Sequence, residues 1–298
     1  MVQVLWAAVS LGLLWSVMTI GVYITYRVLD VADLTVEGSI TLGAAVAGHM
    51  ISRGLDPQLS LLIAFGAGCL AGLATGLLHT KLRIPVLLSG ILTMIALYSV
   101  NLRVLGKANV SMLRMETIYT GVGRLMGIDK TGSVMAVGLL AAFGIAGILY
   151  WFFGTELGSA IRATGNNQAM VRAQGINTDG TIIISLMLAN GLVALSGNLI
   201  AQQQNYADVM MGTGAIVIGL ASLIIGEVLF GKRNFFVRLV SVVFGAITYR
   251  IIIALVLRLG MHADDLKLFT ALTVALALAL PRFKDLRDTV RASLLRRA

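Results

Sequence analysis

Long apolar runs recur along this chain and limit its possible folds more than any other feature. Runs of about 17 to 25 residues, such as 59–78, 133–153 and 236–257, contain few charged side chains. As helices they cross a hydrocarbon core of about 30 Å. A helix satisfies its own backbone hydrogen bonds in lipid, so repeated runs predict helices and not open sheets. The chain is predicted to be an all-α, polytopic transmembrane bundle.

Composition agrees with a membrane protein. Of the 298 residues, 58% are hydrophobic and 12% are charged, whereas a soluble domain has about 25% charged residues. The net charge of +9 comes with Lys and Arg gathered at the ends of apolar runs. Basic residues at these positions indicate how the helices are oriented in the membrane and suggest contact with anionic lipid. Membrane lipid is therefore an expected partner, and nucleic acid is not.

The order of the runs predicts about eight to nine spans. The predicted helical runs cover residues 5–29, 40–51, 59–78, 85–101, 133–153, 181–201, 214–230, 236–257 and 266–280. Residues 103–132 form the longest expected loop between them. Residues 1–281 would be the transmembrane domain, and 282–298 a basic tail on the cytosolic membrane surface. More Lys and Arg lie on the side of residues 154–180, which places that segment in the cytosol and the amino terminus outside.

The polar stretch 154–180 interrupts two of these runs. Asn167 suits a helix N-cap and Gly175 a helix stop, so residues 168–174 are predicted to form a helix of about two turns. Met170 and Val171, beside Arg172, would offer an apolar knob with a charged rim, and residues 155–164 a helical stalk. A helix this short needs something to pack on. Two interpretations stay open: a docking surface for a partner, or a loop that only lies on the membrane.

A second polar stretch, 30–39, contains three acidic residues directly before an apolar helix. It is either a plain polar loop or a broken, re-entrant helix whose backbone is tolerated at membrane depth because protein or a water-filled path surrounds it.

The run 181–201 carries polar side chains on one helical face: Asn190, Asn198 and Gln202. Such side chains join membrane helices to one another or line a solute path. Similarly, Arg250 in the run 236–257 either extends to the membrane surface or has a pathway or pairing role.

No enzyme or cofactor constellation stands out. The three His residues are far apart, and the single cysteine, Cys69, lies in an apolar run. Residues 226–232 imitate a phosphate-binding loop, but Arg233 stands where Ser or Thr is required and no strand precedes it. We therefore expect no cofactor on this chain, no metal site and no enzymatic activity. Active transport would need an ion gradient or another subunit.

Two stretches together resemble a known family. Residues 33–39, DLTVEGS, are similar to the D-L-S-V-G-S element of bacterial sugar permeases, with Glu37 inserted. Residues 157–163, LGSAIRA, fit the pattern L-G-x-A-x-R-A. Asn167, 172–173 and 175–177 are similar to the A-x-x-x-G-I-N that follows it in the family, with one residue between Ala173 and Gly175. The chain thus resembles, over about 34–280, the permeases of bacterial ABC importers for branched-chain amino acids and ribose-type sugars. With the extra Glu37, this stretch resembles the sequences of a less characterised branch of the family, whose suspected solutes are aromatic amino acids.

This resemblance implies a type II importer-like fold in the bacterial cytoplasmic (inner) membrane. It implies a homodimer or close heterodimer with the pathway on its two-fold axis, ABC ATPase subunits that carry the ATP and Mg, and an extracytoplasmic solute-binding protein. The residues expected to couple to the ATPase are Arg162, Asn167, Gln168, Met170, Val171, Arg172, Ala173 and Gly175. Those expected on the pathway are Asp33, Thr35, Glu37, Ser39, Asn190, Asn198 and Gln202.

The alternative is an ion-gradient-driven secondary carrier that uses Asp33, Glu37 and Arg250. That class usually contains paired broken helices in inverted repeats, and the sequence offers one candidate without a second copy. A simple membrane anchor is disfavoured by the polar face of the run 181–201.

Overall fold

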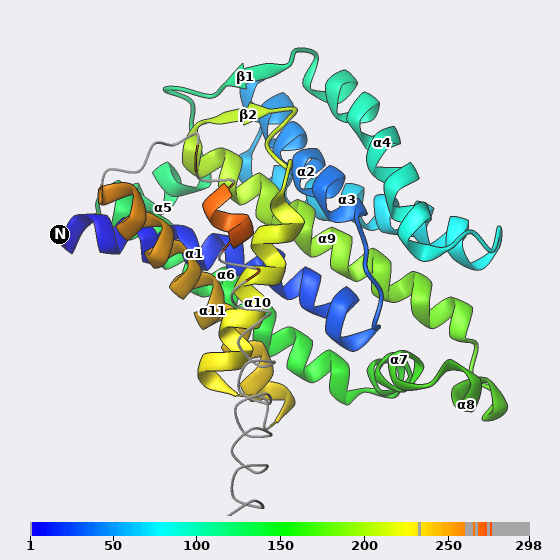
Figure 1. Ribbon diagram of the computed structural model, residues 1–298. Coiled ribbons are helices and arrows are strands. Elements are labelled where there is room, and N and C mark those ends of the chain that lie inside the picture. Colours follow the sequence, from blue (N-terminus) through cyan, green and yellow to red (C-terminus); the bar gives the residue numbers. More distant parts are fainter. Residues whose placement is uncertain (1, 232–233, 260–264, 266–267, 273–274, 276–298) are drawn as a thin grey trace, which may run out of the picture.

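The computed structural model describes residues 2–231, 234–259, 265, 268–272 and 275. Most of the run predicted at 266–280, and the whole tail 282–298, lie outside the described residues. The described part folds into eleven α-helices, one short π-helix and two strands (Figure 1). In chain order they are α1 (Val2–Tyr23), η1 (Ile24–Val28), α2 (Thr35–Ser52), α3 (Pro57–Thr80), α4 (Val86–Leu105), β1 (Asn109–Ser111), α5 (Ile118–Met126), α6 (Lys130–Gly154), α7 (Glu156–Asn166), α8 (Gln168–Ala173), α9 (Thr178–Gln204), β2 (Tyr206–Asp208), α10 (Ala215–Phe230) and α11 (Phe235–Arg258).

Six helical segments among the described residues are long and apolar enough to cross a membrane. They are Gln3–Val28, Pro57–Thr80, Val86–Leu105, Lys130–Gly154, Thr178–Gln204 and Phe235–Arg258. Two further predicted runs are also helices but are shorter: α10 has 16 residues and α2 has 18. The prediction of a helical, multi-spanning bundle is therefore confirmed.

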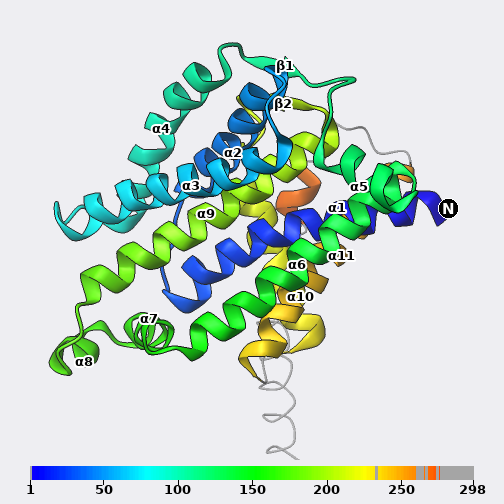
Figure 2. The ribbon, with the colours of Figure 1, turned by 180° about the vertical axis from the view of Figure 1, so that it is seen from behind.

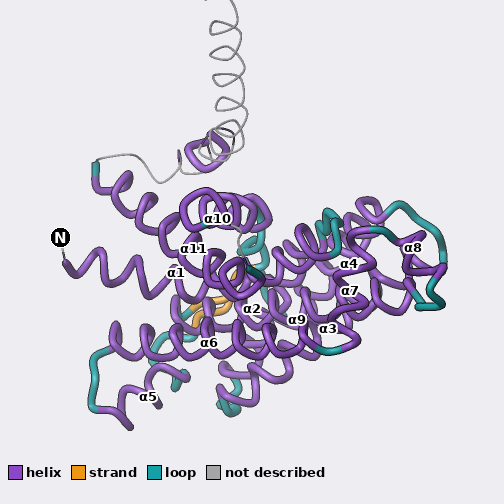
Figure 3. Tube along the Cα trace, turned by 90° about the horizontal axis from the view of Figure 1, so that it is seen from below, coloured by secondary structure: helices purple, strands orange, loops and turns teal. Residues whose placement is uncertain are grey.

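The bundle has an inner and an outer set of helices. The apolar window of α1 is 83% buried and that of α9 is 72% buried, against 28% for α4 and 33% for α3 and α6. The helix α2 is buried along almost its whole length, and Figure 3 shows it near the middle of the bundle. The helices α3, α4 and α6 thus offer apolar faces to the surroundings, while α1, α2 and α9 form the centre.

Small residues let the central helices approach closely. A Cβ added to Gly43 of α2 would overlap the carbonyl oxygen of Ala194, and one added to Gly197 of α9 would overlap that of Ile40. The contact is thus made by glycine from both sides. Close backbone approach through small residues is the usual packing mode of membrane helices, because lipid gives apolar side chains no reason to prefer protein.

The two ends of the bundle differ. At one end lie α7, α8, the α3–α4 turn and the α10–α11 turn; at the other lie α5 and the strands (Figure 2). There β1 pairs antiparallel with β2, with Asn109 opposite Asp208. The long loop expected at 103–132 contains β1 and also α5, which begins at a capping box on Thr117.

Candidate functional site

Three local caps build the polar segment around α8. The Thr155 hydroxyl accepts the Gly158 N–H (3.3 Å), Asn167 Oδ1 accepts the Met170 N–H (3.0 Å) and Asn177 Oδ1 accepts the Gly180 N–H (3.2 Å). Each side chain satisfies a backbone donor that a helix start leaves free. Gly175 follows with φ +82°, a left-handed conformation that costs glycine little. The predicted short helix with its cap and its glycine stop is confirmed, although α8 ends one residue earlier, at Ala173.

The helix α7 attaches this segment to the bundle. Gly165 lies so close to η1 that an added Cβ would overlap the carbonyl oxygen of Val28. The Thr164 hydroxyl pairs with that of Thr181 on α9 (2.9 Å), and Ile161 is completely buried. The predicted stalk at 155–164 therefore corresponds to α7, which is slightly longer, and it contacts both the end of α1 and the start of α9.

Most of the residues predicted to form the exposed surface of α8 are indeed exposed, but one of them is buried. Gln168, Arg172 and Ala173 are exposed, as are Asn167 and Gly175.

Met170 is 47% exposed, whereas Val171 is completely buried. The expectation that Met170 and Val171 form one apolar knob was wrong for Val171. That side chain instead holds α8 against the bundle, and Met170 alone forms the apolar projection.

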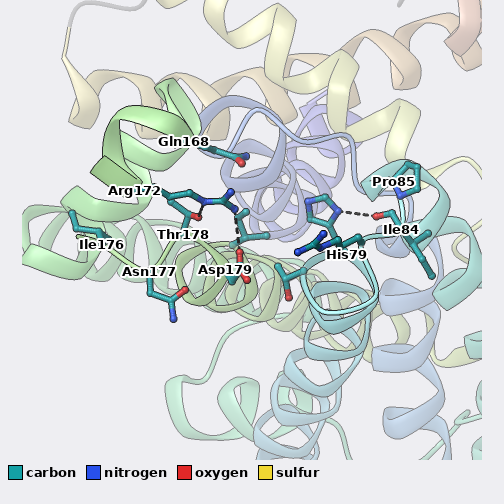
Figure 4. A pocket seen from close by; sticks show the side chains of 12 residues that line it. His79, Ile84, Pro85, Gln168, Arg172, Ile176, Asn177, Thr178 and Asp179 are labelled. Carbon is teal, nitrogen blue, oxygen red and sulfur yellow. Dashed lines mark hydrogen bonds and ion pairs between the residues drawn. The ribbon is translucent and has the colours of Figure 1, made fainter. Parts of the chain in front are cut away.

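A polar cleft of 710 Å³ lies beside α8 (Figure 4). Gln168, Arg172 and the first residues of α9 line one wall, and the α3–α4 turn with His79 and Arg83 lines the other. Arg172 is fixed by Nε donating to the Thr178 hydroxyl (2.5 Å) and by an ion pair with Asp179 (3.2 Å). The cleft and the exposed face of α8 are therefore continuous through Arg172.

Arg162 lies apart from the other predicted coupling residues, on the opposite side of α7. Its guanidinium carbon is 5.5 Å from the ring centre of Phe235, and it lines a second cleft of 450 Å³ together with Arg27 and Arg238. Arg27 forms an ion pair with Glu227 of α10. Through this cleft the α7–α8 segment also adjoins the start of α11.

Four of the predicted pathway residues meet in one buried hydrogen-bonded cluster. Asp33 Oδ1 accepts the Thr35 N–H (2.9 Å), and Asp33 Oδ2 accepts from Asn190 Nδ2 (2.7 Å). The Ser39 hydroxyl donates to Asn190 Oδ1 (2.7 Å). All four residues are at most 2% exposed. A buried polar network of this kind is stable only when its members are satisfied, and these are.

The cluster lies where the helical backbone is broken, between η1 and α2. Leu29, Val31 and Asp33, between η1 and α2, are buried. Asp33 bonds to Asn190, which lies 12 residues into α9, or about 18 Å at 1.5 Å per residue. Asp33 therefore lies at depth beside α9, although Asp30 and Ala32 of the same segment are exposed. Of the two interpretations of residues 30–39, the geometry fits the broken helix.

Asn198 and Gln202 form a separate cluster farther along α9. Asn198 Nδ2 donates to the Ser60 carbonyl (3.0 Å), Gln202 Nε2 donates to Asn198 Oδ1 (2.8 Å), and Gln202 Oε1 accepts the Ile118 N–H (2.9 Å). Both residues are completely buried. In this conformation they join α9 to α3 and α5, which is the helix-joining role that the sequence left open.

Glu37 is the one predicted pathway residue that is not buried. Its Oε1 accepts the Gly214 N–H (3.0 Å) at the start of α10, and it lines a cavity of 440 Å³ against α4.

Arg250 does not extend to a membrane surface. Its guanidinium carbon lies 4.0 Å from the ring centre of Trp15, which favours the pairing interpretation.

Sequence reasoning missed several partners of these clusters. The Thr35 hydroxyl pairs with that of Thr75 (2.7 Å), which bonds in turn to Thr93 (2.9 Å). Asn101 Nδ2 donates to the Gly38 carbonyl (3.1 Å). A signal exists: Ser89, Thr93, Leu97, Asn101 and Leu105 recur at every fourth position and form the buried face of α4.

Comparison with known proteins identifies the family. Residues 5–280 match the family described as branched-chain amino acid transport system, permease component. The chain belongs to this permease family. It is a multi-pass membrane permease of a bacterial ABC transporter and is not itself the catalytic subunit.

Three relatives illustrate the range of the family. This permease is 40% identical to a tyrosine transport system permease protein of Clostridioides difficile, over 90% of its own length and 88% of the relative's. It is 31% identical to an uncharacterized protein of Rickettsia prowazekii, over 95% of its own length and 100% of the relative's. It is 26% identical to the ribose import permease protein RbsC of Escherichia coli, over 65% and 60% of the two chains. No solved structure matches this permease.

Proposed function

We propose that this permease is the membrane subunit of an ABC importer for amino acids, with α8 as its coupling helix to the ATPase. The observation that carries the proposal is the construction of α8: a capped helix whose Met170 projects outward while Val171 anchors it inside. A short helix that is fixed at its back and free at its front suits docking into a groove of another protein.

Coupling requires that the ATPase bind α8 differently in its two states, since equal binding shifts no equilibrium. The firm attachment of α7 to η1 and α9 provides a rigid connection for such a shift. Movement of α8 would reach α9 through the Thr164–Thr181 contact, and the end of α1 through Gly165. ATP and Mg would be held by the ATPase subunits.

The translocation pathway would run beside the break between α1 and α2. Asp33, Thr35, Ser39 and Asn190 hold that break in place, and Glu37 lies at its accessible side. Discontinuous helices of this kind form solute sites in other transporters. Asn198 and Gln202 would enter the pathway only in a conformation in which α9 separates from α3 and α5.

An amino acid is the solute that the relatives favour. The relative with 40% identity is named for tyrosine transport, and the alignment covers most of both chains. The relative named for ribose import is less similar and shares only part of its length. We propose that an extracytoplasmic solute-binding protein delivers the amino acid.

The architecture would be type II importer-like, with two copies of the permease on a two-fold axis. The described helices that would cross the membrane are α1, α2, α3, α4, α6, α9, α10 and α11, with residues 266–280 as a ninth span. On this assignment residues 1–281 form the membrane domain, with 154–180 and the tail 282–298 in the cytosol and the amino terminus outside.

Coexpression with a candidate ABC ATPase subunit from the same organism tests the proposal. The wild type should copurify with the ATPase, and ATP should drive amino acid uptake into proteoliposomes when the binding protein is supplied. Met170→Glu and Arg172→Glu should each reduce copurification and uptake at least tenfold, because both change the exposed face of α8.

Lys107→Glu provides the matched control, since Lys107 is equally exposed but lies beyond α4 at the opposite end. It should copurify like the wild type. Unchanged complex formation and uptake in the α8 variants would refute the coupling role. Uptake by the permease alone, driven by a proton or sodium gradient, would instead support a secondary carrier.

A further inference from the structure

We propose that the cavity between α2, α4 and residues 209–213 is the contact site for the solute, and that it takes an α-amino acid with an aromatic or large apolar side chain. This inference rests on the proposed import function. It adds the place and the chemistry of recognition within the membrane subunit.

The cavity is large enough for a small molecule, and its lining has a polar part and an apolar part. Its volume is 440 Å³, within the range of about 300 to 1,000 Å³ typical of small-molecule sites. Glu37 and Asn101 are the polar members that carry the argument. Met94, Ile95, Tyr98 and Met210 form the apolar part. A mostly apolar lining with a few polar groups is the usual composition of a ligand site.

The Asn101 side chain supplies a buried acceptor without a donor. It is 1% exposed, its Nδ2 donates to the Gly38 carbonyl (3.1 Å), and its Oδ1 accepts no hydrogen bond in the described part of the chain. The Gly38 carbonyl fixes which end of the amide is the nitrogen, because two oxygens would otherwise face each other. A buried acceptor left unpaired is costly, and a ligand with N–H groups would remove that cost.

Glu37 adds negative charge next to this acceptor. Glu37 and Asn101 both line the cavity, and Glu37 directly precedes Gly38, whose carbonyl accepts the Asn101 amide. The Glu37 carboxylate accepts backbone N–H groups of Gly214 and Ile216 at the start of α10. A carboxylate in the first turn of a buried helix would be expensive against lipid. It fits a position that faces a solute path.

A primary ammonium matches these two groups. It carries a positive charge and three N–H donors, enough for the Glu37 carboxylate and Asn101 Oδ1 together. The neighbouring Met94 and Met210 sulfurs and the Tyr98 ring favour contact with an aromatic ring. Backbone N–H groups at the start of α10 already bond to the Glu37 carboxylate. An ammonium would add a full positive charge, which an uncharged sugar lacks, and this is why we assign an amino acid to the cavity.

A purely structural role for Glu37 makes a different prediction. If Glu37 only accepts the Gly214 N–H at the start of α10, then Gln, which keeps the length and the acceptor oxygen, should replace it better than Asp. If its charge binds an ammonium, Asp should replace it better than Gln. The order of Glu37→Asp and Glu37→Gln thus separates the two roles.

The experiment compares these variants in the full complex of permease, ATPase and binding protein, with tritiated L-tyrosine as the probe. Variants that elute with the ATPase as one species are tested for ATP-driven uptake. Glu37→Gln should reduce uptake at least tenfold and Glu37→Asp by less. Glu116→Gln is the matched control, because Glu116 is an exposed carboxylate that pairs with Arg124 just before α5, at the end of the bundle opposite α8. It should retain wild-type uptake within twofold.

Each outcome decides a separate question. Uptake by Glu37→Gln equal to or above that of Glu37→Asp overturns the recognition site while leaving the import function intact. A wild-type complex that shows no ATP-driven uptake of L-tyrosine or of any other amino acid in the binding protein's ligand screen refutes the proposed function itself.

Discussion

The α7–α8 segment and the α1–α2 break are both polar interruptions of an apolar chain, yet they are built in opposite ways. The caps of α7, α8 and α9 join residues three positions apart, as in the Met170–Asn167 bond. The cluster at the break joins residues 151 and 157 positions apart, as in Ser39–Asn190 and Asn190–Asp33. Most residues of α8 are exposed, whereas the four residues of the cluster at the break are buried.

This difference separates two consequences of mutation. Where bonds are local and the surface is exposed, a substitution can remove a partner contact and leave the fold unchanged. Where bonds connect distant helices in a buried place, a substitution removes stability before it can affect a solute. The following predictions, from the largest effect to the smallest, test this division.

The largest effect is expected where α9 meets α2. Gly197→Val should lower the free energy of unfolding by about 3 kcal/mol or more, because the new side chain would overlap the Ile40 backbone, which cannot move aside without shifting a central helix. Thermal unfolding in detergent, followed by the recovery of monodisperse protein, measures it. Gly144→Val in α6 is the control, since no atom lies within 4 Å of a Cβ added there; equal losses in both would contradict the explanation.

A smaller loss is expected from the buried cluster. Asn190→Leu should cost about 2 to 3 kcal/mol, because it leaves the Asp33 oxygen without its donor and the Ser39 hydroxyl without its acceptor. The combined exchange Asp33→Asn with Asn190→Asp retains a carboxylate–amide pair and should recover part of the loss. A double-mutant cycle on thermal unfolding measures the coupling, and strictly additive effects would show that the pair does not act as a unit.

Next come two adjacent residues of α8. Val171→Ala should destabilise the attachment of α8 by about 1 to 2 kcal/mol, because Val171 is completely buried, while Met170→Ala should change it by less than about 0.5 kcal/mol. Amide hydrogen exchange of residues 168–174 measures this local stability. If both variants exchange alike, α8 does not have the anchored and free faces described above.

The smallest effect is expected at a single cap. Asn167→Ala should weaken α8 by about 1 kcal/mol, because the Met170 N–H loses its acceptor at the helix start. Faster exchange should be confined to the first turn of α8, with no change in the melting temperature of the bundle. A global loss of stability would mean that the α7–α8 segment is less independent than its local bonds indicate.

The same division explains which parts could be predicted from the sequence. The short helix α8 was predictable because Asn167 and Gly175 mark its ends through their own backbone chemistry. The long apolar helices were predictable because lipid requires them. The burial of Val171 was not, since an apolar residue in a two-turn helix can face either way until its neighbours are known.

Partners across the bundle were also beyond the sequence. Nothing near Asp33 indicates that Asn190 is its partner, and the link from Thr35 to Thr75 joins two separate helices. The strand β1 was missed for the same reason, because its partner β2 is about a hundred residues away. Asn101 had a readable signal in its four-residue spacing, but its role depends on the distant carbonyl of Gly38.

The ribbon of β1 and β2 has a mechanical meaning for the whole molecule. It joins the segments that follow α4 and α9, and so holds the carboxy-terminal ends of the two helices together. The 710 Å³ cleft lies instead between the α3–α4 turn, just before α4, and the first residues of α9. We expect the distance between the two helices to change more at the cleft than at the ribbon. Spin labels at residues 81 and 174 should therefore report larger distance changes during ATP turnover than labels at 107 and 206.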